Sequence, residues 1–125
     1  MKQAGDILVV DDEANILSLV VEVLEEEGYA VRSATNGVDA LHAIAAQRPG
    51  LVMVDMYMPH MSGMMVVEHL AANGLADLPV ILMTASTSAA EQVLSQSNVD
   101  YLPKPFELTQ LLDLVARYLP PPGAL

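Results

Sequence analysis

The sequence has no cysteine, few basic residues and no long hydrophobic run. Without cysteine, the chain forms neither a disulfide framework nor a thiolate metal site, and it suits a reducing compartment. No apolar stretch approaches the roughly 20 residues that span a bilayer, and residues 1–6 show no signal-peptide pattern. We therefore expect no membrane association and a cytoplasmic location.

Positive charge is scarce. The chain carries 16 Asp and Glu residues against five Lys and Arg residues, which gives a formal net charge of −11 at pH 7. A chain this acidic repels the phosphates of nucleic acids, so we expect this domain alone to bind no nucleic acid. Most of the acidity is typical of a solvated surface, but carboxylates that converge in the fold would form a cation pocket.

The remaining composition is that of an ordinary globular domain. It is 53% hydrophobic and 17% charged over 125 residues, which is enough for one domain and too few for two. We expect this domain to cover residues 1–119. Residues 120–125 include consecutive prolines and are either a Pro-rich tail or the start of a linker.

Short apolar runs alternate along the chain with segments of helical periodicity. Runs without polar alternation indicate strands that are buried on both faces of a sheet. Strands are predicted over residues 7–10, 30–34, 51–54, 79–83 and 100–102. Helices are predicted from residue 12 or 13 to a C-terminal Gly28, and over residues 38–47, 64–73, 88–96 and 107–119. The alternation predicts an α/β fold with a parallel sheet and helices on both faces.

Polar residues end the predicted strands on the same side. Asp11 and Asp12 follow the first strand, Asp55 the third, Thr84 the fourth and Lys104 the fifth. In an open parallel sheet, ligands bind just outside the carboxyl ends of the strands. We therefore expect three carboxylates, one hydroxyl and one ammonium group at a single edge of the sheet.

This set of groups suits phosphoryl chemistry. Carboxylates that meet raise one another's pKa, and a bound divalent cation relieves the repulsion. Oxygen-only ligands suit Mg²⁺. With the metal bound, Asp55 can act as a nucleophile toward phosphorus. The metal, Lys104 and Thr84 can then stabilise charge on the phosphoryl oxygens.

Each of these residues also has an ordinary structural role. An aspartate such as Asp55 commonly forms a turn, and Asp11 or Asp12 could cap the following helix. Thr84 could cap a helix too, and Lys104 could be a surface lysine. The hypothesis of a phosphorylation site rests on their joint occurrence, in this order, at one sheet edge.

The motifs resemble the response-regulator receiver family of two-component signalling, over about residues 7–119. The matching pieces are residues 9–13 (Val-Val-Asp-Asp-Glu), 55–63 (Asp-Met-Tyr-Met-Pro-His-Met-Ser-Gly), 83–85 (Met-Thr-Ala) and 100–106 (Asp-Tyr-Leu-Pro-Lys-Pro-Phe). The resemblance implies a flavodoxin-like, doubly wound, five-stranded sheet with strand order 2-1-3-4-5.

The resemblance also implies residue roles. Asp55 would be the phosphoacceptor. Asp12 and Asp55 would ligate Mg²⁺ through their side chains, Tyr57 through its backbone carbonyl, and Asp11 mainly through water.

Further residues would form the switch. Thr84 would bond to the phosphoryl group and report its presence, and Lys104 would pair with that group. The Lys104–Pro105 peptide bond would be cis. The rotamer of Tyr101 would change on activation. The switched surface would be the fourth helix, the fifth strand and the fifth helix.

The implied protein is a signalling receiver and not an enzyme with a separate substrate, because it catalyses only its own phosphorylation and dephosphorylation. Its partners would be a histidine kinase or a histidine phosphotransfer protein, and a downstream effector or output domain. It would be a monomer or a phosphorylation-dependent dimer.

Three other functions share parts of this pattern. A phosphohydrolase with an aspartyl-phosphate intermediate needs an aspartate two residues beyond the nucleophile, where this chain has Tyr57. A flavin carrier needs a hydroxyl- and glycine-rich loop after the first strand, where this chain has Asp11 and Asp12. The alternative that stays open is a receiver-like interaction module that is not regulated by phosphorylation.

Methionine is unusually concentrated around the third and fourth predicted strands. Such a cluster can form an adaptable binding surface, but core and loop packing is the favoured interpretation in a short domain. The residues are Met53, Met56, Met58, Met61, Met64, Met65 and Met83.

Overall fold

The computed structural model describes residues 5–85 and 98–121 of the chain. A five-stranded parallel sheet lies at its centre, with strand order β2-β1-β3-β4-β5. The strands are β1 (Ile7–Val10), β2 (Val31–Ala34), β3 (Leu51–Asp55), β4 (Val80–Thr84) and β5 (Val99–Pro103). The helices are α1 (Ala14–Glu26), α2 (Gly37–Ala46), α3 (Gly63–Ala72) and α5 (Leu108–Tyr118). The predicted fold class and strand order are confirmed.

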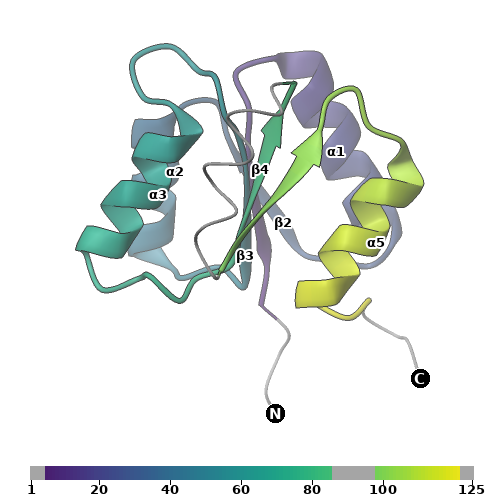
Figure 1. Cartoon of the computed structure of the whole chain (residues 1–125). Helices are drawn as coiled ribbons and strands as arrows, with labels where there is room; N and C mark the ends of the chain where they lie inside the picture. The colour runs from purple at the N-terminus through teal and green to yellow at the C-terminus, as the bar shows by residue number, and fades with distance from the viewer. Residues whose placement is uncertain (1–4, 86–97, 122–125) are drawn as a thin grey trace.

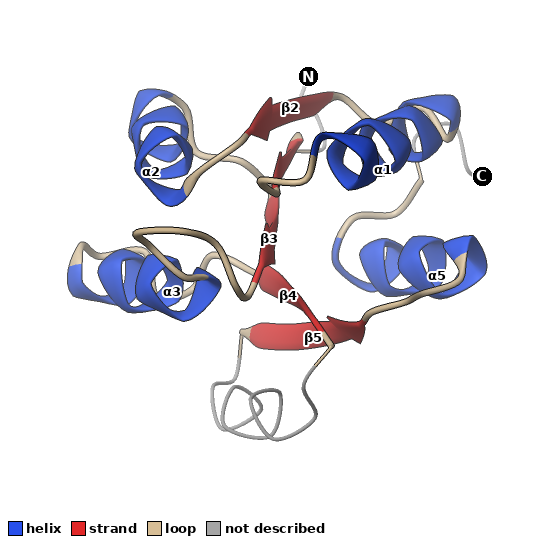
Figure 2. Ribbon diagram, turned by 90° about the horizontal axis from the view of Figure 1, so that it is seen from above, coloured by secondary structure: helices blue, strands red, loops and turns tan. Residues whose placement is uncertain are grey.

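Helices cover both faces of the sheet. Figures 1 and 2 show α2 and α3 on one face and α1 and α5 on the other. Alternate strand residues enter two separate buried clusters, because successive side chains of a strand point to opposite faces. Leu8 and Val10 of β1 belong to the α2–α3 cluster, and Ile7 and Val9 belong to the α1–α5 cluster. These runs lack polar alternation because both faces are covered.

The predicted element boundaries are close to the observed ones. β3 and β4 run one residue further than predicted and include Asp55 and Thr84, and β5 is one residue longer at each end. Both polar residues keep their place in the ladder, where Asp55 is in register with Met83 and Thr84 with Pro103. Backbone pairing therefore continues beyond the apolar run that the pattern detects. The helix predicted over residues 88–96 lies outside the described residues.

Local signals fix the helix ends. The side chain of Asn36 accepts a hydrogen bond from the backbone N–H of Asp39 at the start of α2, and Ser62 caps Met65 in the same way at the start of α3. Gly28 follows α1 with a φ of 96°, a conformation in which glycine has no steric penalty. No helix within residues 5–85 and 98–121 has the length and apolar character needed to cross a membrane.

Arg32 joins the edge strand β2 to the end of α2. Its guanidinium donates hydrogen bonds to the backbone carbonyls of Ala43 (2.9 Å) and Gln47 (2.7 Å), and it pairs with the carboxylate of Asp6. The carbonyls at a helix C-terminus carry partial negative charge, so a cation there is favourable. The carbonyl of Ala43 accepts from Arg32 in addition to the backbone N–H of Gln47. One side chain thus holds α2, β2 and the segment before β1 together.

We predict that Arg32→Met lowers the free energy of unfolding by about 1–3 kcal/mol, because it leaves Asp6 and two carbonyls without their charged donor. The matched control is Arg48→Met, since the one ion pair of Arg48 within residues 5–85 and 98–121 is with Asp77, whose side chain is 78% exposed. That variant should change stability by no more than about 0.5 kcal/mol. Urea unfolding followed by circular dichroism measures both, and equal losses would show that Arg32 has no special role.

Candidate functional site

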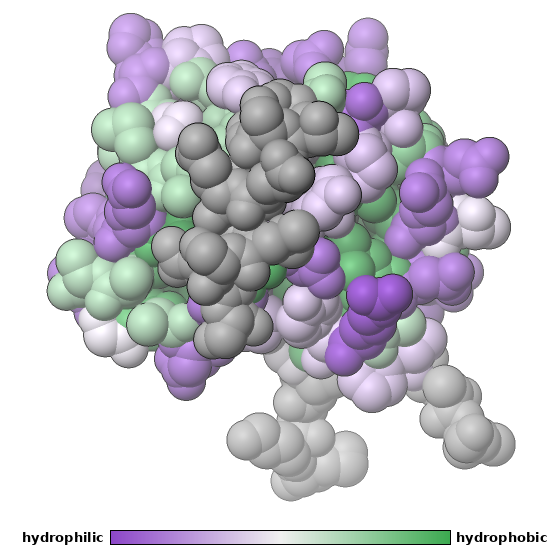
Figure 3. Space-filling model, viewed as in Figure 1, coloured by the Kyte–Doolittle hydropathy of each residue, from purple (hydrophilic) through white to green (hydrophobic). Residues whose placement is uncertain are grey.

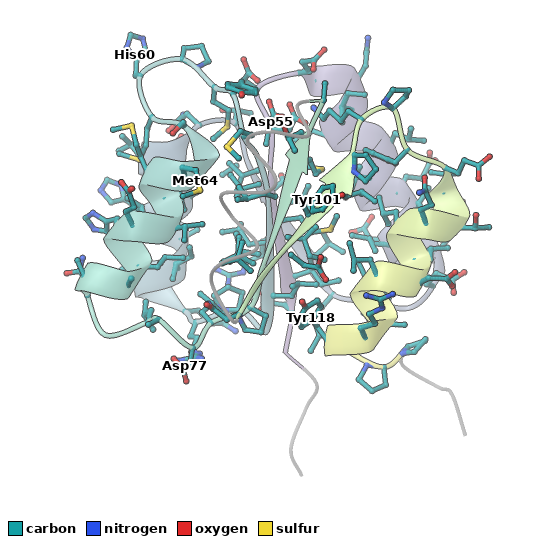
Figure 4. All side chains as sticks on the ribbon, viewed as in Figure 1. Asp55, His60, Met64, Asp77, Tyr101 and Tyr118 are labelled. Atoms are coloured by element: carbon teal, nitrogen blue, oxygen red, sulfur yellow. The ribbon has the colours of Figure 1, made fainter. Side chains whose placement is uncertain are left out.

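The carboxyl ends of the central strands meet at one edge of the sheet. In Figure 4, Asp55 lies at this upper end, on the same side as His60, whereas Asp77 and Tyr118 lie at the opposite end. The parallel register explains the meeting, because Val10 of β1 pairs with Val54 of β3 immediately before the aspartates. The strands therefore deliver their last side chains to a common place.

Three carboxylates converge at this edge. Asp11, Asp12 and Asp55 each place an oxygen so that the three atoms lie within 4.8 Å of one another. Asp11 is fully buried and Asp55 is 6% exposed, whereas Asp12 is exposed to solvent. The predicted acidic cluster is present, with one side open to water.

Lys104 is the cation of the cluster. Its ammonium nitrogen lies 3.1 Å from a carboxylate oxygen of Asp11, 3.1 Å from one of Asp55 and 3.6 Å from one of Glu13. The Lys104 side chain is only 18% exposed, so it is not a free surface lysine. The Lys104–Pro105 peptide bond is cis, as the sequence resemblance implied.

Backbone contacts hold the two sides of the site in place. The backbone N–H of Lys104 donates to the carbonyl of Thr84 (2.9 Å), and the N–H of Glu13 donates to the second carboxylate oxygen of Asp11 (2.9 Å). Both oxygens of Asp11 therefore already accept a hydrogen bond, one of them from Lys104. The contact of Glu13 with Lys104 was not predicted from the sequence. The one signal for it was the position of Glu13 directly after Asp12.

Burial and charge act in opposite directions on the two central groups. Burial raises the pKa of Asp55; the hydrogen bond and charge of Lys104 lower it, and the nearby carboxylates of Asp11 and Asp12 raise it again, so that it lies above its ordinary value. Burial lowers the pKa of Lys104, but its bonds to Asp55 and Asp11 and their charges outweigh this and raise it. Lys104 therefore stays protonated.

The other predicted residues lie around this centre. Thr84 ends β4 and is 2% exposed, so its position at the edge of the site is fixed by the sheet. Tyr57 stands in the loop between β3 and α3, and its side chain is 60% exposed. Tyr101 lies on β5 in register with Leu82 and is partly buried. The structure brings Thr84 to the acidic cluster and places Tyr101 on the adjoining strand.

A glycine allows α3 to pack directly against the phosphoacceptor candidate. A Cβ atom on Gly63 would stand 2.6 Å from the backbone oxygen of Asp55 and 2.6 Å from a methyl carbon of Leu82. The N–H of Gly63 donates to the carbonyl of Met56 (2.9 Å), which closes the loop between β3 and α3. From the sequence, Gly63 is only a glycine at the end of a loop, and its close approach to Asp55 could not be predicted.

The donor set fits a hard divalent cation. All candidate ligands are oxygens, and the exposed side of Asp12 leaves room for the waters that Mg²⁺ retains. A cation here would also offset the repulsion among the three carboxylates. Among the described residues, this is the one group of three or more potential metal-binding side chains that converge in this way.

Comparisons with known proteins agree with this geometry. Residues 7–116 match the sequence family described as the response regulator receiver domain. The chain is 43% identical over 108 residues to the response regulator MprA of Mycobacterium sp. (strain KMS), a match that covers 85% of this chain and 46% of that protein. It is 42% identical over 108 residues to MprA of Mycobacterium avium (strain 104), with 85% and 47% covered. The chain thus spans about half the length of these relatives.

Solved structures show the same fold. The receiver domain of Francisella response regulator 1452 superposes with a TM-score of 0.84 at 28% identity, covering 91% of this chain and 95% of that one. The chemotaxis response regulator CheY4 of Vibrio cholerae superposes with a TM-score of 0.85 at 27% identity, covering 94% of this chain and all (100%) of that one.

The burial of Asp55, together with the charges of Asp11 and Asp12 beside it, predicts a stability effect. Because the pKa of Asp55 is raised in the folded protein, its ionised carboxylate destabilises the fold above that pKa, and the penalty disappears as acid protonates it. Asp55→Asn should therefore be more stable than wild type at pH 7 without Mg²⁺, and the difference should shrink as the pH falls through the raised pKa. Urea unfolding across pH tests this.

The matched control is Asp77→Asn, whose side chain is 78% exposed and lies at the opposite end of the sheet (Figure 4). Its stability should stay close to that of wild type at every pH. An Asp55→Asn variant that is less stable than wild type at pH 7 would mean that the Lys104 contact outweighs the repulsion.

Proposed function

The chain belongs to the response regulator receiver family, and from this premise we propose that it accepts a phosphoryl group on the carboxylate of Asp55 in a Mg²⁺-dependent reaction. The donor would be a histidine kinase, a histidine phosphotransfer protein or a small phosphodonor. The observation that carries the proposal is the position of the Lys104 ammonium, 3.1 Å from Asp55 and 3.1 Å from Asp11 at the edge of the acidic cluster.

The transfer itself is an in-line displacement. An oxygen of the Asp55 carboxylate forms a bond to phosphorus while the bond from phosphorus to the donor's leaving atom breaks, and the leaving atom keeps the electron pair. Lys104 already lies beside the reacting carboxylate, so its charge can pass from Asp55 to a phosphoryl oxygen without a large movement. The burial of Asp55 strengthens this electrostatic contribution.

Mg²⁺ would be held by the side chains of Asp12 and Asp55 and by the backbone carbonyl of Tyr57, with Asp11 acting mainly through water, and it would supply positive charge to the phosphoryl oxygens. The two hydrogen bonds that Asp11 already accepts support its indirect role. The solvent exposure of Asp12 supports direct contact with a hydrated ion.

Partners and setting belong to the same proposal. The matched relatives are response regulators about twice as long as the aligned region, so we propose an effector or output domain as the reader of the phosphorylated state, in the cytoplasm. The net charge of −11 supports a role without nucleic-acid contact by this domain. The alternative is an interaction module that is never phosphorylated, and the first test below distinguishes the two functions.

The switch would run from Thr84 to Tyr101. New phosphoryl oxygens need donors, and Thr84 lies at the cluster with its position fixed by β4. A movement of its hydroxyl toward Asp55 would leave space that Tyr101 of the neighbouring strand can fill. The changed surface would include β5, α5 and residues 88–96. Of these, residues 88–96 lie outside the described residues. A difference of a few kcal/mol between the two states is enough for such a shift.

Acetyl phosphate and Mg²⁺ should add one phosphoryl group to the wild-type chain, and none to Asp55→Asn, because the amide cannot act as the nucleophile. Intact-protein mass spectrometry measures the added mass, and omission of Mg²⁺ should abolish it. Asp77→Asn, altered far from the site, should be labelled like wild type. Undiminished labelling of Asp55→Asn would refute the site, and no labelling of wild type would favour the interaction module.

Thr84→Ala should still accept the phosphoryl group but transmit it poorly, because the hydroxyl that responds to the group is lost. Thr84→Ser keeps the hydroxyl and serves as the control. NMR spectra of each protein with and without beryllofluoride, a phosphoryl mimic, report the response of residues 99–119. Wild type and Thr84→Ser should show large shifts there. Equal shifts in Thr84→Ala would exclude Thr84 as the relay.

A further inference from the structure

The methionines around β3 and β4 differ sharply in their access to solvent. Four are buried, with exposed fractions of 0% for Met53, 3% for Met56, 8% for Met58 and 0% for Met83. Met61 and Met64 are partly buried and pack against the α2–α3 cluster, whereas Met65 is 47% exposed. Figure 4 shows sulfur atoms gathered near α3 and the upper part of the sheet, and Figure 3 shows apolar surface on the α3 side.

Met61 lies against the first residue of α2. A Cβ atom built on Gly37 would stand 2.7 Å from the sulfur of Met61 and 2.8 Å and 2.9 Å from its Cγ and Cβ atoms. The Met61 side chain therefore lies close against the backbone of Gly37, and a side chain at position 37 would require Met61 to move.

This contact anchors the loop that leaves Asp55. The loop runs from Met56 to the Ser62 cap of α3, and the side chains of Met56, Met58 and Met61 all pack into or against the α2–α3 cluster. Its tip includes His60 at a φ of 71°, a conformation that non-glycine residues rarely adopt. Two backbone hydrogen bonds also hold the loop: the N–H of Met61 donates to the carbonyl of Pro59 (2.8 Å), and the N–H of Gly63 donates to the carbonyl of Met56 (2.9 Å).

We propose that Met61 is a site of reversible oxidation, through which peroxides weaken Mg²⁺ binding at the acidic cluster and so slow phosphorylation. The inference rests on the proposed function, because it assigns a regulation to the same site. The oxidant is a hydroperoxide, and the atom that it oxidises is the sulfur of Met61.

The chemistry is a two-electron oxygen transfer. A lone pair of the Met61 sulfur attacks one peroxide oxygen, the O–O bond breaks, and the sulfur becomes a sulfoxide while the other oxygen takes up a proton and leaves as water or an alcohol. The sulfur is oxidised and the peroxide is reduced. Methionine sulfoxide reductases reverse the change.

The physical consequence follows from the contact with Gly37. The sulfoxide is strongly polar, and its burial among apolar side chains is unfavourable. Since the Gly37 backbone lies against one side of the sulfur, an oxygen added on that side would push the side chain outward, and the loop would lose an anchor. Tyr57, whose carbonyl is the proposed Mg²⁺ ligand, stands four residues before Met61 in this loop. A displaced carbonyl weakens the site.

Neighbouring methionines provide internal controls. Met65 is the more exposed residue, so its sulfur oxidises readily, but its oxygen can point into water without disturbing a contact. Met53 and Met83 are fully buried, so their sulfurs are closed to peroxide in the folded protein.

The test compares wild type, Met61→Leu and Met65→Leu, each as the full 125-residue chain. Each is treated with hydrogen peroxide until peptide mass spectrometry shows complete oxidation at the accessible methionines. Mg²⁺ affinity is then measured by calorimetry and the phosphorylation rate with acetyl phosphate. Oxidised wild type and Met65→Leu should lose about tenfold in Mg²⁺ affinity, as is usual when support of a metal ligand is removed. Met61→Leu should keep its affinity, and a methionine sulfoxide reductase should restore wild type.

Met61→Gln gives an independent measurement, because its polar side chain imitates the sulfoxide without peroxide. It should bind Mg²⁺ more weakly than Met61→Leu, while circular dichroism shows both to be folded. An equal loss of affinity on oxidation of Met61→Leu, or full affinity in wild type oxidised at Met61, would overturn the inference. Untreated wild type that neither binds Mg²⁺ nor accepts phosphate would instead refute the proposed function.

Discussion

The mutual repulsion of Asp11, Asp12 and Asp55 is the constraint on which this molecule depends. Their oxygens lie within 4.8 Å of one another, an arrangement that raises the free energy of a fold unless positive charge is near. Among the residues that the structure describes, Lys104 supplies the one ammonium group in contact with two of them. The site therefore favours a further positive charge, which supports the proposal of a Mg²⁺ site.

The fold keeps these charges together by rigid packing. Asp55 ends a strand whose residues are buried on both faces, and the neighbouring strands are held in register on each side of it. Gly63 lets α3 approach the backbone of Asp55 so closely that a side chain of any size would collide. Core packing on both faces thus offsets the electrostatic penalty at the edge, since packed interiors deform little.

The sequence allowed the fold and the central residues of the site to be predicted. Apolar runs without alternation indicated a parallel sheet, and such a sheet brings its carboxyl ends together, so Asp11, Asp55 and Lys104 could be placed at one edge by their position alone. The strand ends were missed by one residue at Asp55 and Thr84, because hydrophobic pattern does not register backbone pairing that continues through a polar residue. The wider contacts of the site could not be predicted.

Those contacts depend on distances between segments that share no sequence pattern. Nothing in the sequence indicates that Glu13 reaches Lys104, or that Met61 lies on Gly37, because both contacts arise only when separate connections fold over the sheet edge. Yet loop contacts of this kind decide how firmly a proposed ligand such as the Tyr57 carbonyl is held, since a carbonyl in a loop has no strand to fix it. The side chains of Asp11 and Asp55 are placed by the sheet, whereas the carbonyl of Tyr57 depends on the packing of its loop. The part of the site that the sequence reveals least is therefore also the part most open to regulation.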